Sequence, residues 1–277
     1  MTYTQLWQSL TPLYDAGEAH AIVRMVLEDR FGISMTDLLC DGTSKMSEAD
    51  LDRLMQMMSR LRNAEPVQYV LGEAWFMGRR FHVELGVLIP RPETEMLCQW
   101  VMDDNTLPNP EILDIGCGSG CIAVTLALEM AGSAITAYDI SPKALAVTER
   151  NALALGATLA IEQQDALHLT DDPHRWDAII SNPPYICHNE REAMHVNVTR
   201  YEPEEALYVP DDAPLLFYTA IADYAATSLR PGGKLYFECN PLYLQDITAM
   251  LSSKGFSAIK DRDDQFGKKR FIQATRP

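Results

Sequence analysis

Apolar residues in the first 65 positions recur at intervals of three and four, which is the spacing of amphipathic helices. One such run extends from Glu18 to Phe31, and Gly32 is a typical residue to end the helix. A second run begins after Ser47, a hydroxyl residue suited to an N-cap, and continues at helical spacing as far as Met58. We therefore predict a small helical bundle over residues 1–65. Because this bundle carries none of the motifs of a chemical site, we expect it to serve as a substrate-docking domain.

The pattern changes after Pro66, which marks a break in the helical spacing. Val67 to Leu71 and Arg80 to Ile89 alternate like strands around Gly72 and Gly78. These residues predict a β-hairpin connector over residues 66–90 rather than a flexible linker.

From Glu111 onward the chain repeats strand, glycine-containing loop, helix and strand, which is typical of a doubly wound, mostly parallel α/β sheet. Ser141 and Pro142 mark a helix start, with a hydroxyl N-cap followed by proline at the first helical position. We predict one α/β domain over residues 91–277, with strands at Ile112–Ile115, Ala134–Ile140, Leu159–Gln163, Ala178–Ser181, Lys234–Cys239, Ser257–Lys260 and Arg270–Thr275.

Length and charge narrow the possible functions. A chain of 277 residues favours one main domain with a smaller appendage. The formal net charge of -16 argues against a duplex-DNA clamp, which needs lysine and arginine to replace phosphate counterions. Acidic residues are concentrated between Ala160 and Asp212, a segment that contains 12 acidic and 3 basic residues. This region suits a basic protein partner, although an acidic surface that serves only solubility remains the alternative.

The chain carries no sign of secretion or of a metal site. No positively charged, apolar segment precedes Tyr14, so we expect a cytoplasmic protein without a membrane span. The histidines form no His-Glu-x-x-His spacing, and we expect no metal. The six cysteines contain no Cys-x-x-Cys pair and are expected to be reduced and structural: Cys40, Cys98, Cys117, Cys121, Cys187 and Cys239.

Asn182-Pro183-Pro184-Tyr185 follows an apolar run, Trp176 to Ser181, that is typical of a buried strand. Neither proline has an N–H, so the loop presents carbonyl oxygens and the Asn182 amide oxygen as hydrogen-bond acceptors. A planar –NH2 group could donate to two of these acceptors while the Tyr185 ring lies against the same plane. For the tetrapeptide alone, an ordinary strand-ending turn remains the alternative.

A glycine loop stands where the first strand of the predicted sheet would turn into its helix. Gly116, Gly118 and Gly120 alternate in it, which lets the backbone pass close under a ligand. The spacing is more compressed than in G-x-G-x-x-G dinucleotide sites, which favours a ligand without a pyrophosphate. Asp139 ends the second strand, where an acid would hold ribose hydroxyls, and Asp165 follows the third strand, where an adenine amino group would lie.

This order of motifs resembles the class I S-adenosylmethionine-dependent methyltransferases, and Asn-Pro-Pro-Tyr occurs in those that methylate planar nitrogens. The segments Ile89–Glu95 and Tyr201–Leu207 further resemble signatures of the release factor glutamine methyltransferases, also called protein-(glutamine-N5) methyltransferases. The resemblance covers nearly the whole chain, and it implies a seven-stranded methyltransferase sheet joined to a small helical bundle by a β-hairpin.

The resemblance also implies roles for individual residues. S-adenosylmethionine would be the cofactor, and class I peptide chain release factors, methylated at the glutamine of their Gly-Gly-Gln motif, would be the partners. Asn182 to Tyr185 would hold the substrate amide, with Asn182, Pro183 and Tyr185 catalytic. The cofactor would be lined by Gly116, Cys117, Gly118, Ser119, Gly120, Asp139, Asp165, Ala166 and Asn182.

Two positions depart from the family pattern. Ala166 stands where some relatives carry an aromatic residue against the adenine, so another residue, such as Ile140, would have to pack there. After Glu238, Cys239-Asn240-Pro241 replaces a more usual glycine-containing stretch, which leaves the role of Glu238 open.

The chemistry follows from the nature of an amide. Its nitrogen lone pair is delocalised into the carbonyl, so an enzyme must position it and favour the pyramidal geometry of the transition state. Asn182 accepting one N–H and the Pro183 carbonyl accepting the other would achieve this. No general base is then required, because a methylated, cationic amide nitrogen loses its proton unaided. An asparagine, unlike an aspartate, avoids burying a charge in the pocket.

Two other functions compete with this prediction. An adenine-amino methyltransferase acting on RNA or DNA would grip the same kind of –NH2 group, but the acidic surroundings and the absence of a basic recognition domain argue against stable nucleic-acid binding. A catalytically silent, methyltransferase-like protein that only binds a partner is the second alternative. The intact glycine loop, Asp139 and Asn182 argue against it.

Overall fold

The computed structural model describes residues 2–39 and 46–277, so Cys40 lies outside the described residues. The chain forms two compact units. One comprises residues 1–73 together with 195–201, and the other comprises residues 74–194 together with 202–277. Within the described ranges, no helix combines the length and apolar character that crossing a membrane requires.

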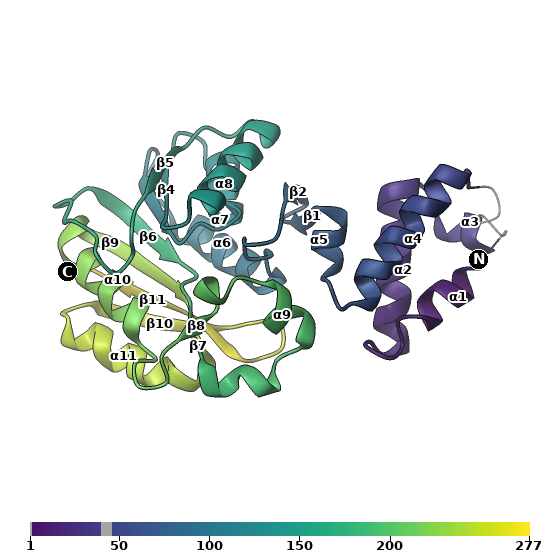
Figure 1. Ribbon diagram of the computed structural model, residues 1–277. Helices are drawn as coiled ribbons and strands as arrows, with labels where there is room; N and C mark the ends of the chain where they lie inside the picture. Colours follow the sequence, from purple (N-terminus) through teal and green to yellow (C-terminus); the bar gives the residue numbers. More distant parts are fainter. Residues whose placement is uncertain (1, 40–45) are drawn as a thin grey trace. The chain divides into compact units, whose positions relative to one another are not determined.

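The N-terminal unit contains the predicted helices. Asp15 accepts a hydrogen bond from the Glu18 N–H at the start of α2, and Gly32 ends this helix in the left-handed conformation with φ 62°. Ser47 caps α4 by accepting from the Asp50 N–H, as predicted. Leu, Val, Ile and Met side chains of these helices form one buried core. The helices are α1 (Tyr3–Gln8), α2 (Ala16–Phe31), α3 (Met35–Leu39), α4 (Glu48–Arg62) and α5 (Val67–Leu71) (Figure 1).

The strand prediction for Val67–Leu71 was wrong, because these residues form α5, with Gly72 at its C-cap at φ 73°. Val67, Val70 and Leu71 belong to the helical core, and packing overrides the strand preference of β-branched residues in so short a run. The hairpin exists but is shorter, with strands β1 (Glu73–Phe76) and β2 (Arg79–His82). Residues 83–89, predicted as strand, lie outside it.

The segment from residue 195 to residue 201 belongs to the N-terminal unit although it follows the Asn182–Tyr185 motif in the chain. It contains α9 (Val196–Tyr201). The Tyr201 hydroxyl donates to the Asn63 carbonyl at 2.7 Å, at the end of α4. The chain thus passes between the two units three times.

The larger unit is built on a seven-stranded sheet with the order β10-β11-β9-β6-β3-β4-β5. Strands β9, β6, β3, β4 and β5 are parallel, and β11 is antiparallel to both of its neighbours. All seven predicted strands are confirmed, and so is the doubly wound, mostly parallel fold class. They are β3 (Glu111–Ile115), β4 (Ala134–Asp139), β5 (Ala160–Gln163), β6 (Trp176–Ser181), β9 (Leu229–Glu238), β10 (Ser257–Asp263) and β11 (Lys269–Thr275).

Helices cover both faces of this sheet (Figure 1). On one face, α6 (Pro92–Asp104) and α7 (Cys121–Glu129) pack on strand residues such as Ile112 and Ile180, and α8 (Pro142–Leu155) lies along β4 and β5. On the other face, α10 (Leu216–Ser228) and α11 (Leu244–Ser253) pack on the alternate strand residues, among them Leu113 and Ile179. Smaller elements are β7 (Ile186–Cys187), β8 (Tyr208–Val209) and short 3₁₀ helices at His188–Ala193, Glu204–Ala206 and Pro241–Tyr243.

The strand order brings the loops that carry the predicted site residues together. From the central strand β3 the chain continues to β4 on one side, whereas β6 and β9 lie on the other side. The carboxyl ends of parallel strands meet at one edge, and such a reversal of strand order opens a crevice there. The loops that follow β3, β4, β5 and β6 therefore gather around one place.

Candidate active site

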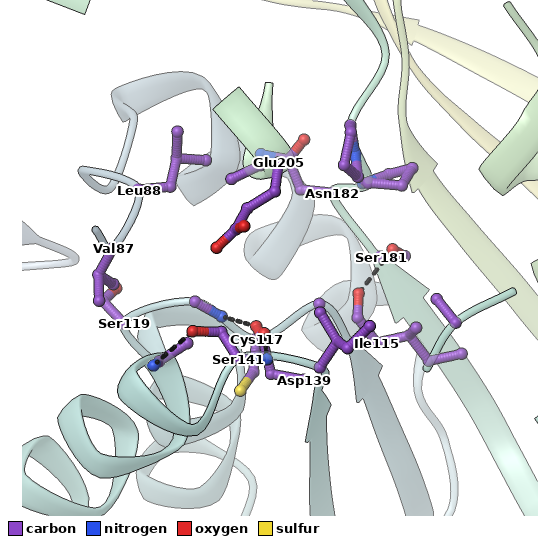
Figure 2. Close-up of a pocket in the computed structure, with 18 of the residues that line it drawn as sticks. Val87, Leu88, Ile115, Cys117, Ser119, Asp139, Ser141, Ser181, Asn182 and Glu205 are labelled. Atoms are coloured by element: carbon purple, nitrogen blue, oxygen red, sulfur yellow. Dashed lines mark hydrogen bonds between the residues drawn. The ribbon is translucent and has the colours of Figure 1, made fainter. Parts of the chain in front are cut away.

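A cavity of about 310 Å³ lies at this edge of the sheet, a size in the range typical of small-molecule sites, roughly 300–1,000 Å³. Its lining comes from the loops after β3, β4, β5 and β6, from residues 86–91 and from residues 203–206 (Figure 2). All of these residues belong to the larger unit.

Most of the predicted site residues line this cavity. They are Gly116, Cys117, Gly118, Ser119, Asp139, Asp165, Ala166, Asn182, Pro183 and Pro184, and Ile140 lines it as well. Two predicted residues are not part of the lining. Gly120 is the N-cap of α7, where an added Cβ would stand 2.7 Å from Thr148 Cγ2, so this glycine permits close packing of α7 and α8. Tyr185 is the second residue outside the lining, and its hydroxyl donates a hydrogen bond to Glu238.

The glycine loop leaves open space on the cavity side. The N–H groups of Gly116 and Cys117 both donate to the Tyr138 carbonyl, at 2.8 and 3.0 Å, which folds the loop back over the end of β4. Gly116 and Gly118 have φ values of 78° and 57°, and a Cβ on either would meet no atom within 4 Å. Because L side chains avoid this backbone region, glycine here keeps the space clear for a ligand.

Two side chains of helix α8 hold the glycine loop by hydrogen bonds. Thr148 donates to the Gly118 carbonyl at 3.1 Å, and the buried Asn151 donates to the Ser119 carbonyl at 2.8 Å. Asn151 also exchanges two hydrogen bonds with the backbone of His82 on β2. The hairpin is therefore fixed to the loop that lines the cavity.

Asp139 is held by backbone N–H groups on both carboxylate oxygens. Gly118 donates to Oδ2 at 2.8 Å and Ser141 donates to Oδ1 at 2.9 Å (Figure 2). Burial raises the pKa of this carboxyl, and the backbone hydrogen bonds partly oppose the shift. Each oxygen keeps a lone pair for a further donor, so the carboxylate is oriented to accept hydroxyl groups.

Asp165 lines the cavity at the start of the loop that follows β5. Its Oδ1 accepts from the Leu167 N–H at 2.9 Å, and its Oδ2 lies 2.7 Å from His168 Nδ1. The hydrogen bond with His168 lowers the pKa of the Asp165 carboxyl. The pKa of the Asp165 carboxyl is thus shifted in the opposite direction to that of Asp139.

The Asn182 side chain is oriented by a chain of hydrogen bonds. Its Nδ2 lies 3.4 Å from the Thr94 hydroxyl, and that hydroxyl donates to Glu238 Oε2 at 2.7 Å. The Tyr185 hydroxyl donates to the other oxygen of Glu238 at 3.1 Å. No group in the described part of the chain hydrogen-bonds to Asn182 Oδ1, so this oxygen is the free acceptor of the side chain.

The two signature segments meet at a buried acid that the sequence did not single out. Glu202, 5% exposed, accepts from the Ile89 N–H at 3.2 Å and from Arg91 Nη2 at 2.6 Å. This contact secures residues 89–91 beside residues 203–206, and both segments line the cavity. Arg91, Thr94 and Glu205 also line the cavity, although the sequence placed them only in the two signature segments and gave them no role of their own. The partners of Arg91 and Thr94 lie 111 and 144 positions away.

Asp114 supports the loop without lining the cavity. It is fully buried and accepts from the Ala123 N–H at 3.1 Å, while its Oδ1 has no hydrogen-bond partner among the described residues. Burial raises the pKa of its carboxyl to about 7. The sequence contained this residue at the end of a predicted strand, but nothing in the pattern indicated how deeply it is buried.

The charges around the cavity favour a cationic ligand. Asp139, Asp165 and Glu205 contribute carboxylates, whereas Arg91 is neutralised by Glu202. Figure 2 shows the Glu205 carboxylate extending into the space between the glycine loop and residues 87 and 88. Among residues 2–39 and 46–277, no group of three His, Cys, Asp or Glu side chains is placed to hold a metal ion.

Two family models match parts of this chain. Residues 93–201 match the family model described as "Methyltransferase small domain", and residues 8–72 match the model described as "PrmC N-terminal domain". A release factor glutamine methyltransferase of Bacteroides thetaiotaomicron is 39% identical over 97% of this chain and 97% of its own length. One from Flavobacterium psychrophilum is 35% identical over 98% and 96%, respectively.

Among solved structures, a methyltransferase from Pyrococcus furiosus superimposes with a TM-score of 0.53. It covers 79% of this chain and 98% of its own, at 16% identity. At this identity the likeness shows a shared fold.

Proposed function

The chain belongs to the release factor glutamine methyltransferase family, and we propose that it transfers a methyl group from S-adenosylmethionine to the side-chain amide nitrogen of a release factor glutamine. The observation that carries this proposal is the free amide oxygen of Asn182 on the cavity wall, next to two prolines that lack N–H groups. This wall accepts hydrogen bonds, and an –NH2 group is what it fits.

The cavity fits the cofactor that the family requires. Gly116 and Gly118 leave a cradle that a Cβ would fill, and Asp139 offers two oriented oxygens to ribose hydroxyls. The excess of carboxylates suits the positive charge of a sulfonium group. When bound, S-adenosylmethionine supplies an electrophilic methyl group. Cys117, Ser119, Ala166 and Ile140 are the further residues that we assign to its binding.

The substrate amide is held by acceptors alone in this proposal. Asn182 Oδ1 accepts one N–H, and the Pro183 carbonyl accepts the other. Two such bonds fix the plane of the amide and favour the transition state, in which the nitrogen lone pair is no longer shared with the carbonyl. Because Asn182 is neutral, the site orients the nitrogen without burying an unpaired charge.

We propose that the target is the glutamine of the Gly-Gly-Gln motif in class I peptide chain release factors. Two glycines before the glutamine allow a backbone without side chains to enter a cavity lined by a glycine loop and prolines. The acidic residues between Ala160 and Asp212 suit a basic protein partner, and they disfavour adenine in RNA or DNA as the substrate.

Transfer of a labelled methyl group tests this function. Purified chain and labelled S-adenosylmethionine are incubated with a class I release factor, with its Gln→Ala variant, with transfer RNA and with ribosomal RNA. We expect label on the wild-type factor only. Label on RNA, or on the Gln→Ala factor, with none on the wild-type factor would contradict the proposal.

We further propose that the N-terminal helical unit docks the release factor. A chain that begins at Glu73 keeps every residue that lines the cavity and the hydrophobic clusters of the larger unit. We expect its rate on the intact factor to fall at least about tenfold, because ordering a flexible substrate without docking contacts costs binding free energy.

A short Gly-Gly-Gln peptide is the matched control for this truncation, because it has nothing to dock. The full-length and truncated chains should methylate it at similar, low rates. An intact factor that is methylated equally well by both chains would show that docking lies elsewhere.

A further inference from the structure

Glu238 is the last residue of β9 and is buried behind Asn182, with 2% of its surface exposed. Its Oε2 accepts a hydrogen bond from the Thr94 hydroxyl at 2.7 Å, and its Oε1 accepts from the Tyr185 hydroxyl at 3.1 Å. When Glu238 is ionised, its carboxylate has no hydrogen to donate, so the hydrogens of both hydroxyls point to Glu238.

The direction of the Thr94 hydrogen bond decides which way the Asn182 amide faces. A hydroxyl has a single hydrogen, so once Thr94 donates to Glu238 its oxygen can only accept from Asn182. The –NH2 end of the amide must then lie toward Thr94, as the 3.4 Å contact of Nδ2 shows. The oxygen end is left on the cavity side.

We propose that Glu238 is a positioning residue that, through Thr94, holds Asn182 with its amide oxygen toward the substrate and so makes the site select an –NH2 group. This inference rests on the proposed function, which it deepens by naming what sets the hydrogen-bonding polarity of the site. It also gives Glu238 a role that the sequence left open.

Without Thr94 and Glu238, the two ends of the Asn182 amide would be nearly equivalent in shape. If the Thr94 oxygen did not accept from it, the –NH2 group of Asn182 would turn toward the cavity and donate to water. It would then face the –NH2 group of the substrate, and two donors cannot form a hydrogen bond with each other. The positive charge of Arg270 on β11 favours the ionised form of the Glu238 carboxyl.

The proposal makes activity depend on the protonation of Glu238. Burial raises the pKa of this carboxyl, while the Thr94 hydrogen bond and Arg270 partly oppose the shift. A protonated carboxyl can donate to Thr94, which frees the Thr94 hydrogen for Asn182 Oδ1 and inverts the amide. Turnover should therefore be full above this pKa and fall as the pH drops through it. Other titratable groups around Glu238 are Tyr185, Glu93, Cys98, Cys121, Tyr218 and Cys239.

The test compares variants of the full chain in the release factor assay. We expect Thr94→Val to lower kcat about 10- to 100-fold, less than the loss of a transition-state hydrogen bond, which costs about 10²–10³-fold. Thr94→Ser, which restores the hydroxyl, should recover most of this turnover. Thr125→Val is the matched control, because it removes a buried hydroxyl on α7 that has no hydrogen-bond partner among the described residues. Its kcat should equal that of the wild type.

The pH dependence of Glu238→Gln distinguishes a positioning role of Glu238 from a structural one. Glutamine keeps the size of the side chain but replaces one acceptor oxygen with a donor, so kcat should fall. Because glutamine does not titrate, the decrease of kcat at low pH should disappear as well. Calorimetric affinity for S-adenosylmethionine, within a few-fold of wild type, reports that these variants are folded.

Undiminished turnover of Thr94→Val, or an unchanged decrease of kcat at low pH in Glu238→Gln, would overturn this inference while the proposed function stood. No transfer to the factor by any variant, including the wild type, would instead overturn the proposed function and this inference with it.

Discussion

Replacing Asn182 by alanine is expected to lower turnover on a release factor by about 10²–10³-fold, the cost of losing one preorganised hydrogen bond in a transition state. The substitution removes the free amide oxygen on the cavity wall and leaves the Pro183 carbonyl as the remaining acceptor. We expect the variant to fold, because the hydrogen bond of the Asn182 side chain to Thr94 among the described residues is long, at 3.4 Å. Single-turnover rates with saturating cofactor measure the effect on the chemical step.

Asn105→Ala serves as the matched control for this prediction, because Asn105 lies at the end of α6 and is not part of the cavity lining. Cofactor affinity should stay within a few-fold of wild type in both variants. If Asn182→Ala turned over within a few-fold of wild type, another group would have to hold the amide.

Replacing Asp139 by alanine is expected to weaken S-adenosylmethionine binding at least about 100-fold, because two charge-assisted hydrogen bonds of about 1.5–3 kcal/mol each would be lost. The structure adds a pH dependence to this prediction. Burial raises the pKa of Asp139, so wild-type affinity should begin to fall on acidification at a higher pH than for an ordinary aspartate. Isothermal titration across the acidic range measures both effects.

The Asp139→Ala variant should lose this acid-side fall in affinity together with the affinity itself. Thermal unfolding of the variant must stay cooperative, since the Gly118 and Ser141 N–H groups lose an acceptor. A folded variant with unchanged affinity, or one with the same pH dependence as wild type, would remove Asp139 from the cofactor site.

The inner strands β3, β4 and β6 could be predicted from the sequence because they are mostly apolar and buried, and each ends at or within two residues of a glycine, a proline or an acidic residue. Val67–Leu71 shows where this reasoning fails. Five mostly apolar residues fit a buried strand as well as a buried helical turn, and only contact with α2 and α4 decides between them. The paired strands instead flank Met77 and Gly78, whose φ values of 47° and 72° make the turn.

The site was predictable where each residue follows its own strand, since topology alone brings Gly116, Asp139, Asp165 and Asn182 to one edge. The supporting contacts were not predictable. Glu202 binds Arg91 from 111 positions away, and Thr94 binds Glu238 from 144 positions away. No local pattern in the sequence encodes such pairs, because each depends on how helices and loops pack over the sheet.

In the proposed reaction, one side-chain nitrogen, selected by acceptors on the cavity wall, receives the methyl group. Tandem mass spectrometry of an intact class I release factor, after reaction with the full chain and S-adenosylmethionine, identifies the methylated atom. We expect one added methyl group, located on the side-chain amide of the glutamine in the Gly-Gly-Gln motif and absent when Asn182→Ala replaces the wild-type chain. A methyl group on any other residue, or on that glutamine in equal yield with Asn182→Ala, would contradict this proposal.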